Sequence, residues 1–157
     1  MPSDFNDKNV IVITGAANGI SSQIALDLDK SGNILCLFDK DSRLKEIAAT
    51  VTKAQVFYKT GDVSLENEVN DFINEVVSRF DKIDALVNGA GVVPYEHIDN
   101  TSYEVFKNTL EINLGGYFLF SKAVSSIMKK NQRGIIINIA STSAELGIVG
   151  QAAYASS

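Results

Sequence analysis

The chain enters its first turn through Val10-Ile11-Val12-Ile13-Thr14-Gly15-Ala16-Ala17-Asn18-Gly19-Ile20-Ser21. The β-branched run 10–14 predicts a strand that is buried on both faces, as in a parallel sheet. Apolar residues then recur at positions 20, 24, 25 and 28, and this spacing predicts a helix with one buried face. A strand, a glycine-rich turn and a helix in this order are typical of phosphate-binding sites at helix N-termini.

Each glycine of this turn has an expected role. Gly15 can form the tight turn, and Gly19 allows a ligand to approach the backbone because no Cβ stands in the way. The spacing is G-x-x-x-G rather than the strict G-x-G-x-x-G of dinucleotide-binding turns. An ordinary strand–helix turn that needs glycine only for its backbone is therefore the alternative interpretation.

Strand-like and helix-like stretches alternate along the rest of the chain. Further strands are predicted at 34–38, 55–58, 83–87 and 135–139, and helices near 44–48, at 69–80 and from about 101 to 130. We expect Ser64 to cap one helix, and Thr101 with Glu104 to form a capping box for the longest one. The order predicts an α/β fold, a Rossmann-like doubly wound parallel sheet truncated after its fifth strand. Ligands of such sheets bind at the carboxyl ends of the strands.

Composition excludes several functional classes. The 157 residues include 14 Lys+Arg and 19 Asp+Glu, for a net charge of −5 without a basic block, which argues against nucleic-acid binding. No uncharged apolar run approaches the ~20 residues of a membrane helix, and Asp4 and Asp7 argue against a signal peptide. The single cysteine, Cys36, is expected in the core and favours a reducing cytoplasm. No cluster of His and Cys predicts a metal site.

An acidic residue closes the second predicted strand. Asp39 follows Gly15 by 24 residues, about where a carboxylate binds the ribose 2′-hydroxyl of NAD. A carboxylate there would repel a 2′-phosphate, so NAD is favoured, whereas Lys40 and Arg43 leave NADP as the less favoured cofactor. In the alternative interpretation, Asp39 only begins a turn with the residues that follow it.

Together these motifs resemble the short-chain dehydrogenases/reductases. Thr14 to Ile20 is similar to the family's TGxxxGIG turn, and Asn88-Gly89-Ala90-Gly91 is similar to its NNAG motif. Asp62-Val63 resembles the family's adenine-contacting segment. Asn113 matches the asparagine of the long helix, while Ser141, and Tyr154 13 residues later, match the family's serine and its Tyr-x-x-x-Lys. The resemblance covers the whole chain, with the motifs in the family's order.

The resemblance implies hydride transfer between a nicotinamide cofactor and a small-molecule carbonyl or secondary alcohol. Tyr154 would be the general acid/base, Ser141 would hold the substrate oxygen, and Asn113 would hold a water in a proton relay. Asn88 would brace the sheet. The family resemblance also implies a homodimer or homotetramer for a full-length protein. The expected cofactor-binding residues are Gly15, Asn18, Gly19, Ile20, Asp39, Asp62, Val63, Asn88, Ala90 and Gly91.

The sequence departs from the family motifs at three places. Ser21 stands where the family has a third glycine, and Gly89 stands where it has a second asparagine. The expected lysine would directly follow Ser157, the last residue given. We therefore expect residues 1–157 to be an NAD(P)-binding Rossmann domain that is incomplete at its C-terminus, the N-terminal part of a longer enzyme and inactive on its own. The alternative is a truncated, non-catalytic dinucleotide-binding or interaction protein.

Overall fold

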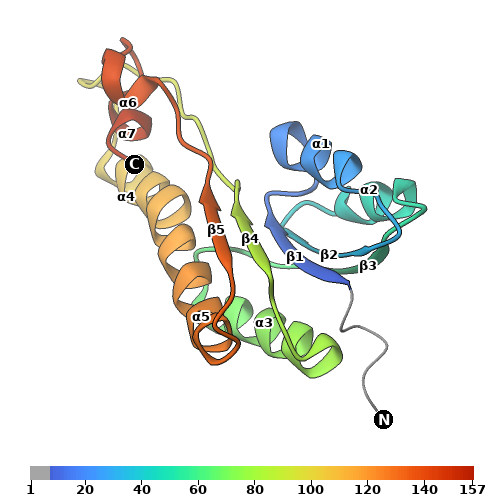
Figure 1. Ribbon diagram of the computed structural model, residues 1–157. Coiled ribbons are helices and arrows are strands. Elements are labelled where there is room, and N and C mark those ends of the chain that lie inside the picture. Colours follow the sequence, from blue (N-terminus) through green and yellow to red (C-terminus); the bar gives the residue numbers. More distant parts are fainter. Residues whose placement is uncertain (1–7) are drawn as a thin grey trace.

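A five-stranded parallel sheet forms the centre of the computed structural model, which describes residues 8–157 (Figure 1). Its order is β3-β2-β1-β4-β5, which confirms the doubly wound fold. The residues on which the prediction about a signal peptide rests, Asp4 and Asp7, lie outside the described part. The strands are β1 (Asn9–Thr14), β2 (Asn33–Asp39), β3 (Gln55–Thr60), β4 (Ala85–Asn88) and β5 (Ile135–Asn138).

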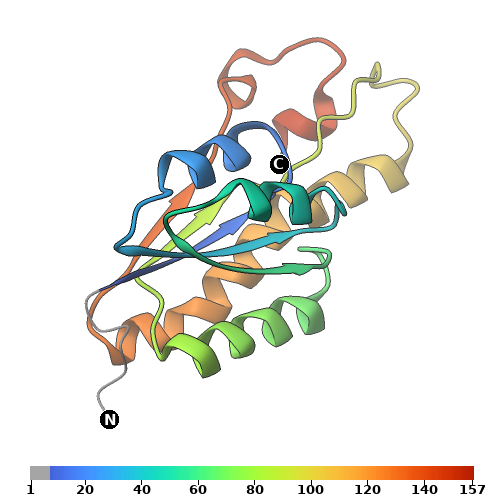
Figure 2. The same cartoon turned by 90° about the vertical axis from the view of Figure 1, so that its right-hand side faces the viewer.

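Helices cover both faces of the sheet (Figure 2). On one face, α1 (Gly19–Asp27) and α2 (Leu44–Thr50) pack on the odd-numbered residues of β1 and β2. On the other, α3 (Glu66–Phe80) and α5 (Gly116–Lys130) pack on the even-numbered residues. Successive side chains of a strand point to opposite faces, so a strand covered on both sides has to be apolar throughout. This explains the continuous apolar runs of the sequence.

The long helix predicted from about 101 to 130 is interrupted. It consists of α4 (Tyr103–Leu110), one π-helical turn η1 (Glu111–Gly115) and α5. The cap is Ser102, whose Oγ accepts a hydrogen bond from the backbone N–H of Val105 at 3.2 Å. The predicted capping box at Thr101 is thus wrong by one residue, because the hydroxyl of Thr101 instead donates to the carbonyl of His97.

The predicted cap at Ser64 is also wrong. Helix α3 begins at Glu66, with Leu65 at the N-cap position and no side-chain cap. The hydroxyl of Ser64 donates instead to Oδ1 of Asp62, at 2.7 Å. A carboxylate two residues upstream offers a charge-assisted bond, which is stronger than a bond between neutral groups.

Beyond β5 the chain forms two short helices, α6 (Ser143–Leu146) and α7 (Ala152–Ala155); α7 packs against α4, and α6 packs against α7 (Figure 1). Strand β5 lies at the edge of the described sheet. Its side chains Ile135, Ile136 and Ile137 are 62%, 40% and 47% exposed. Within residues 8–157, no helix is long and apolar enough to cross a bilayer.

Candidate functional site

The turn after β1 requires glycine at two positions. Gly15 and Gly19 have φ values of 68° and 60°, in the left-handed region that favours glycine. A Cβ on Gly15 would also lie 2.7 Å from the backbone of Ala90, whereas one on Gly19 would meet no atom within 4 Å. Gly15 therefore lets the turn pack against the segment after β4, and the open space at Gly19 leaves room for a ligand beside the start of α1.

Thr14 joins the same two segments, a role that the sequence reasoning missed. Its Oγ1 accepts hydrogen bonds from the backbone N–H groups of Gly89 and Ala90, at 3.1 and 3.3 Å. The side chain is buried. The available signal was a hydroxyl residue at the end of a buried strand, since such a hydroxyl needs a hydrogen-bond partner.

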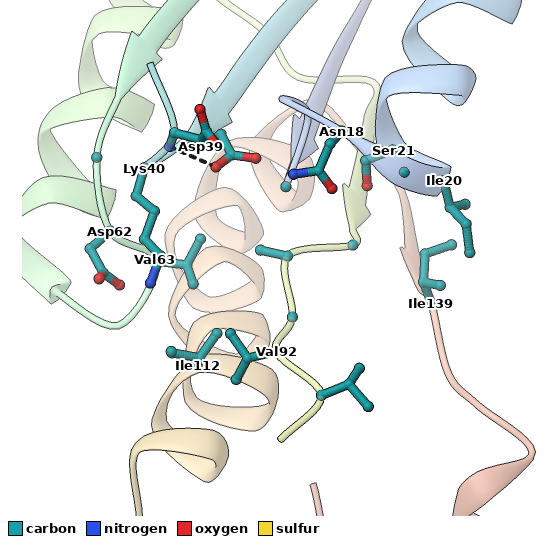
Figure 3. Close-up of a pocket in the computed structure, with 18 residues that line it drawn as sticks. Asn18, Ile20, Ser21, Asp39, Lys40, Asp62, Val63, Val92, Ile112 and Ile139 are labelled. Carbon is teal, nitrogen blue, oxygen red and sulfur yellow. Dashed lines mark hydrogen bonds between the residues drawn. The ribbon is translucent and has the colours of Figure 1, made fainter. Parts of the chain in front are cut away.

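A cleft of about 560 Å³ lies where the carboxyl ends of β1, β2 and β4 meet (Figure 3). Lys40 also lines it, as do Val92 and Val93, whereas no site role was predicted for Asp41 and Ile112, which line it too. The cleft brings together nine of the ten expected cofactor-binding residues, namely Gly15, Asn18, Gly19, Ile20, Asp39, Asp62, Val63, Ala90 and Gly91.

The start of α1 faces this cleft. Asn18 is the N-cap residue in an extended conformation, and its amide makes no capping hydrogen bond. Free backbone N–H groups and the positive end of the helix dipole suit a pyrophosphate at this place. Ile20 was expected on the buried face of the helix, but it is 65% exposed and lines the cleft instead. It lies in the first turn of α1, at the carboxyl end of the sheet, where the cleft opens.

The carboxylate of Asp39 is anchored at the end of β2. Its Oδ2 accepts a hydrogen bond from the N–H of Ala17, and its Oδ1 accepts one from the N–H of Asp41, both at 2.9 Å. The second bond is the turn that the alternative interpretation predicted. Each carboxylate oxygen has a second lone pair, so Asp39 can still accept a bond from a diol in the cleft.

The two cations near Asp39 differ in their surroundings. Arg43 forms a salt bridge with Asp41, in which Nη2 lies 2.6 Å from Oδ2. Hydrogen bonds from the side chain of Arg43 foremost, and then from its backbone N–H, lower the pKa of Asp41 to about 2. Lys40 lines the cleft. Lys40 is therefore the better placed of the two to meet a phosphate on the ribose.

Asp62 and Val63 form the wall of the cleft after β3. Burial raises the pKa of Asp62, but hydrogen bonds from the N–H and hydroxyl of Ser64, and the charge of Lys40, outweigh burial and lower it below its usual value. Val63 is buried against Gly116, where a Cβ would lie 2.8 Å from its Cγ2. The two hydrogen bonds from Ser64 thus favour the ionised form of Asp62 and orient its carboxylate.

Asn88 is the one expected cofactor-binding residue that does not line the cleft. It is fully buried, and its Nδ2 donates to Oδ1 of Asn138 at 3.0 Å and to Oγ of Ser121 at 3.3 Å. These bonds connect β4 with β5 and α5. Such a placement fits the bracing role that the family resemblance implies for Asn88.

A second cleft of about 470 Å³ adjoins the first and brings the three expected catalytic residues together. Asn113, Ser141 and Tyr154 come from η1, from the segment after β5 and from α7, respectively. The two clefts share the lining residues Ile20, Gly89, Gly91, Val93 and Ile139. Asn113 precedes Ser141 by 28 residues, and the two residues line one cleft only in the folded chain. Ser141 and Tyr154 both belong to the segment after β5.

Asn113 holds the segment after β4 from the π-helical turn. Its Oδ1 accepts a hydrogen bond from the N–H of Val92 at 2.8 Å, and its Nδ2 donates to the carbonyl of Val92 at 3.0 Å. Nδ2 also donates to Oγ of Ser157, at 2.8 Å. π-Helical turns are rare in proteins, and those that occur are often located at functional sites.

The hydroxyl of Ser141 is bonded within a local turn. It donates to Oγ of Ser143 at 3.1 Å and accepts a bond from the N–H of Ser143 at 3.2 Å. Tyr117 lines the same cleft and was missed by the sequence reasoning. Burial foremost, and then the neighbouring Tyr154, raise the pKa of Tyr117, whose hydroxyl donates to the carbonyl of Ile139.

Comparison with known proteins decides the family. The model of the short chain dehydrogenases matches residues 9–157. This chain belongs to the short-chain dehydrogenase family. It is 33% identical to an oxidoreductase of Thermotoga maritima over 148 residues (92% of this chain and 58% of the relative), and 31% identical to an NAD-dependent glycerol dehydrogenase of Listeria innocua over 156 residues (98% and 61%).

Solved structures of dehydrogenases have the same fold. NAD⁺-bound xylitol dehydrogenase superposes with a TM-score of 0.90 at 32% identity, over 98% of this chain and 60% of that one. An alcohol dehydrogenase of Thermococcus sibiricus in complex with 5-hydroxy-NADP superposes with a TM-score of 0.88 at 31% identity, over 95% and 65%. This short-chain dehydrogenase sequence therefore spans about three-fifths of the length of its relatives.

Proposed function

We propose that this chain contains the cofactor-binding part and most of the catalytic residues of an NAD(P)-dependent oxidoreductase. The enzyme would act on a small-molecule carbonyl or secondary alcohol. The observation that carries the proposal is the shared wall between two clefts. One cleft contains the glycine turn and Asp39, and the adjoining one contains Asn113, Ser141 and Tyr154. A cofactor in the first cleft would have its reactive end beside the second.

The residues of the first cleft suit a dinucleotide. The first N–H groups of α1 and the open backbone at Gly19 would hold the pyrophosphate. Asp39 would accept a hydrogen bond from the ribose diol, and Asp62 would lie beside the adenine. When bound, the nicotinamide cofactor supplies the hydride chemistry.

The residues of the second cleft would handle the substrate. Tyr154 would donate a proton to the carbonyl oxygen, or accept one from the alcohol in the reverse direction. Ser141 would hold the same oxygen by a hydrogen bond, for which its hydroxyl must leave the turn with Ser143. Asn113, which is bonded to the backbone of Val92, would position a water that takes part in a proton relay. Tyr117 would contribute its ring to the wall of the cleft.

We further propose that NAD is preferred over NADP. Asp39 supports this preference, because its carboxylate would repel a 2′-phosphate. Arg43 supports it too, since its charge is paired with Asp41. Lys40 in the lining of the cleft is the feature that would favour NADP instead.

The experiment that tests the proposed function is calorimetric titration of the purified 157-residue chain with NAD⁺ and NADP⁺. We expect binding of NAD⁺, weaker binding of NADP⁺ and little turnover, because the chain spans about three-fifths of its relatives. Substrates for the turnover assay include glycerol, xylitol and cyclopentanol, after the names of relatives of similar sequence or fold. Failure of both dinucleotides to bind would contradict the proposal, and steady turnover would contradict the expected inactivity of this chain.

The full-length protein is proposed to be a homodimer or homotetramer in the cytoplasm. Exposed apolar side chains on the long helix, Leu114 and Phe118, support self-association. The buried, reduced Cys36 supports a reducing compartment. Sedimentation of a full-length protein as a monomer would contradict the first of these proposals.

A further inference from the structure

Two of the departures from the family motifs meet in space. Ser21 lies in the first turn of α1, where Figure 3 labels it. Gly89 lies directly after β4, and both residues line the first cleft. A Cβ built on Gly89 would lie 2.2 Å from Oγ of Ser21, far closer than two such atoms can approach. Its next neighbours, the carbonyl of Thr14 and Cγ1 of Ile139, would be at ordinary contact distances of 3.4 and 3.5 Å. Oγ of Ser21 is therefore the one atom of these three that a Cβ at position 89 would overlap.

The side chain of Ser21 is buried in the wall of the cleft. Ser21 is 2% exposed, and its Oγ has no hydrogen-bond partner among residues 8–157. A buried hydroxyl without a partner is unfavourable. Removal of the Ser21 hydroxyl would break no hydrogen bond within residues 8–157. The contact with Gly89 is what this side chain contributes at the start of α1.

The segment that contacts Ser21 is otherwise held tightly against the first turn. The N–H groups of Gly89 and Ala90 are bonded to Thr14, and Gly15 approaches Ala90 so closely that no Cβ fits between them. A larger residue at position 89 needs Oγ of Ser21 to turn aside, and where that hydroxyl cannot turn, this segment has to move away from α1. That movement would break the bonds to Thr14 and shift a wall of the cleft.

We propose that positions 21 and 89 share one side-chain volume in the wall of the dinucleotide cleft, and that this chain fills it from α1 with Ser21. Ser21 is then a positioning residue, which sets the distance between the start of α1 and the segment Gly89–Ala90. The volume can be filled from either side but not from both. The departures at Ser21 and Gly89 are therefore one reciprocal exchange, and the effect on cofactor binding rests on the proposed function.

The test is a double-mutant cycle on the 157-residue chain with Gly89→Asn, Ser21→Gly and the combination of both. NAD⁺ affinity is measured by calorimetric titration, and the midpoint of thermal unfolding is measured for each variant. Gly32→Asn is the matched control, because a Cβ at Gly32 meets no atom within 4 Å and its φ is not positive.

We expect Gly89→Asn to weaken NAD⁺ binding about tenfold or more, the fold-change that corresponds to a moderate coupling energy between contacting residues. It should also lower the unfolding midpoint. The double variant should recover the NAD⁺ affinity to within about threefold of the original chain. Ser21→Gly alone should have a smaller effect than Gly89→Asn, and the Gly32→Asn control should bind as the original chain does.

Three results would overturn the proposal. One is a Gly89→Asn chain that binds NAD⁺ and unfolds as the original does, and another is a double variant that is no better than Gly89→Asn. The third is recovery of the unfolding midpoint without any change of NAD⁺ affinity across the cycle, which would remove the positioning role. If the original chain binds no dinucleotide, the proposed function fails separately, and recovery of the midpoint in the double variant still supports the shared volume.

Discussion

Asp39 makes the turn bond that the sequence offered as its alternative role, and it also lines the cleft. The two roles are compatible because a carboxylate has more lone pairs than the two backbone N–H groups use. The bonds to Ala17 and Asp41 leave the carboxylate little freedom to turn away. A ligand diol would then meet an acceptor that is already oriented.

We predict that Asp39→Asn weakens NAD⁺ binding about tenfold and lowers the preference for NAD⁺ over NADP⁺, because hydrogen bonds to charged groups are the stronger ones. The affinities for both dinucleotides are measured by calorimetric titration. Asp71→Asn, at an exposed position of α3, is the matched control. An unchanged ratio of the two affinities would show that Asp39 does not discriminate between the cofactors.

At the scale of elements, the buried face of a helix was predictable, whereas the N-terminal caps of α3 and α4 were not. The spacing of Val69, Phe72 and Val76 makes the buried face of α3 visible in the sequence, and all three are buried. The cap at Ser64 failed because its hydroxyl is bonded to Asp62. Choosing among nearby hydrogen-bond partners depends on the path of the backbone, which apolar spacing does not reveal.

Asp29 connects the end of α1 with the entry to β3. Its carboxylate accepts hydrogen bonds from the backbone N–H groups of Thr52, Lys53 and Ala54, at 3.0, 2.7 and 2.7 Å. These bonds, that from Thr52 foremost, lower the pKa of Asp29 from 3.8 to about 2. A partly exposed carboxylate thus organises the segment between α2 and β3.

We predict that the bonds of Asp29 make the stability of the chain depend on pH at the acid end. The pKa is lower in the folded chain than the 3.8 of a free carboxyl, so the stabilisation is present above pH 3.8 and is lost as the pH falls towards about 2. Urea unfolding at a series of pH values measures this loss. In Asp29→Asn the decrease between these pH values should be smaller; a decrease of the same size would contradict the assignment.

At the scale of the whole molecule, β5 leaves an apolar row at the edge of the described sheet. Ile135, Ile136 and Ile137 are all substantially exposed, and the next strand of the sheet, β4, lies on one side only. Unpaired backbone groups on an apolar edge strand form a template for pairing with another chain. The edge follows from the strand order, which no local pattern contains.

We predict that the 157-residue chain self-associates through β5, and that Ile135→Lys weakens this association about tenfold, because a charged residue on an edge strand opposes pairing. Sedimentation velocity over a range of protein concentrations measures the association. Ile98→Lys is the control, since it is the same change at an exposed isoleucine in the loop before α4. Equal association of the two variants would exclude β5 as the contact.

The sequence by itself determined the alternation of strands and helices, the glycine turn and the order of the family motifs. These features depend on neighbouring residues, through the spacing of apolar side chains and the conformational freedom of Gly15 and Gly19. Only the tertiary structure decided that Thr14 bonds to the segment after β4, that Ser21 lies against Gly89, and that two clefts share a wall. Such contacts join residues distant in the chain, and they exist only once the parallel strands bring their carboxyl ends together.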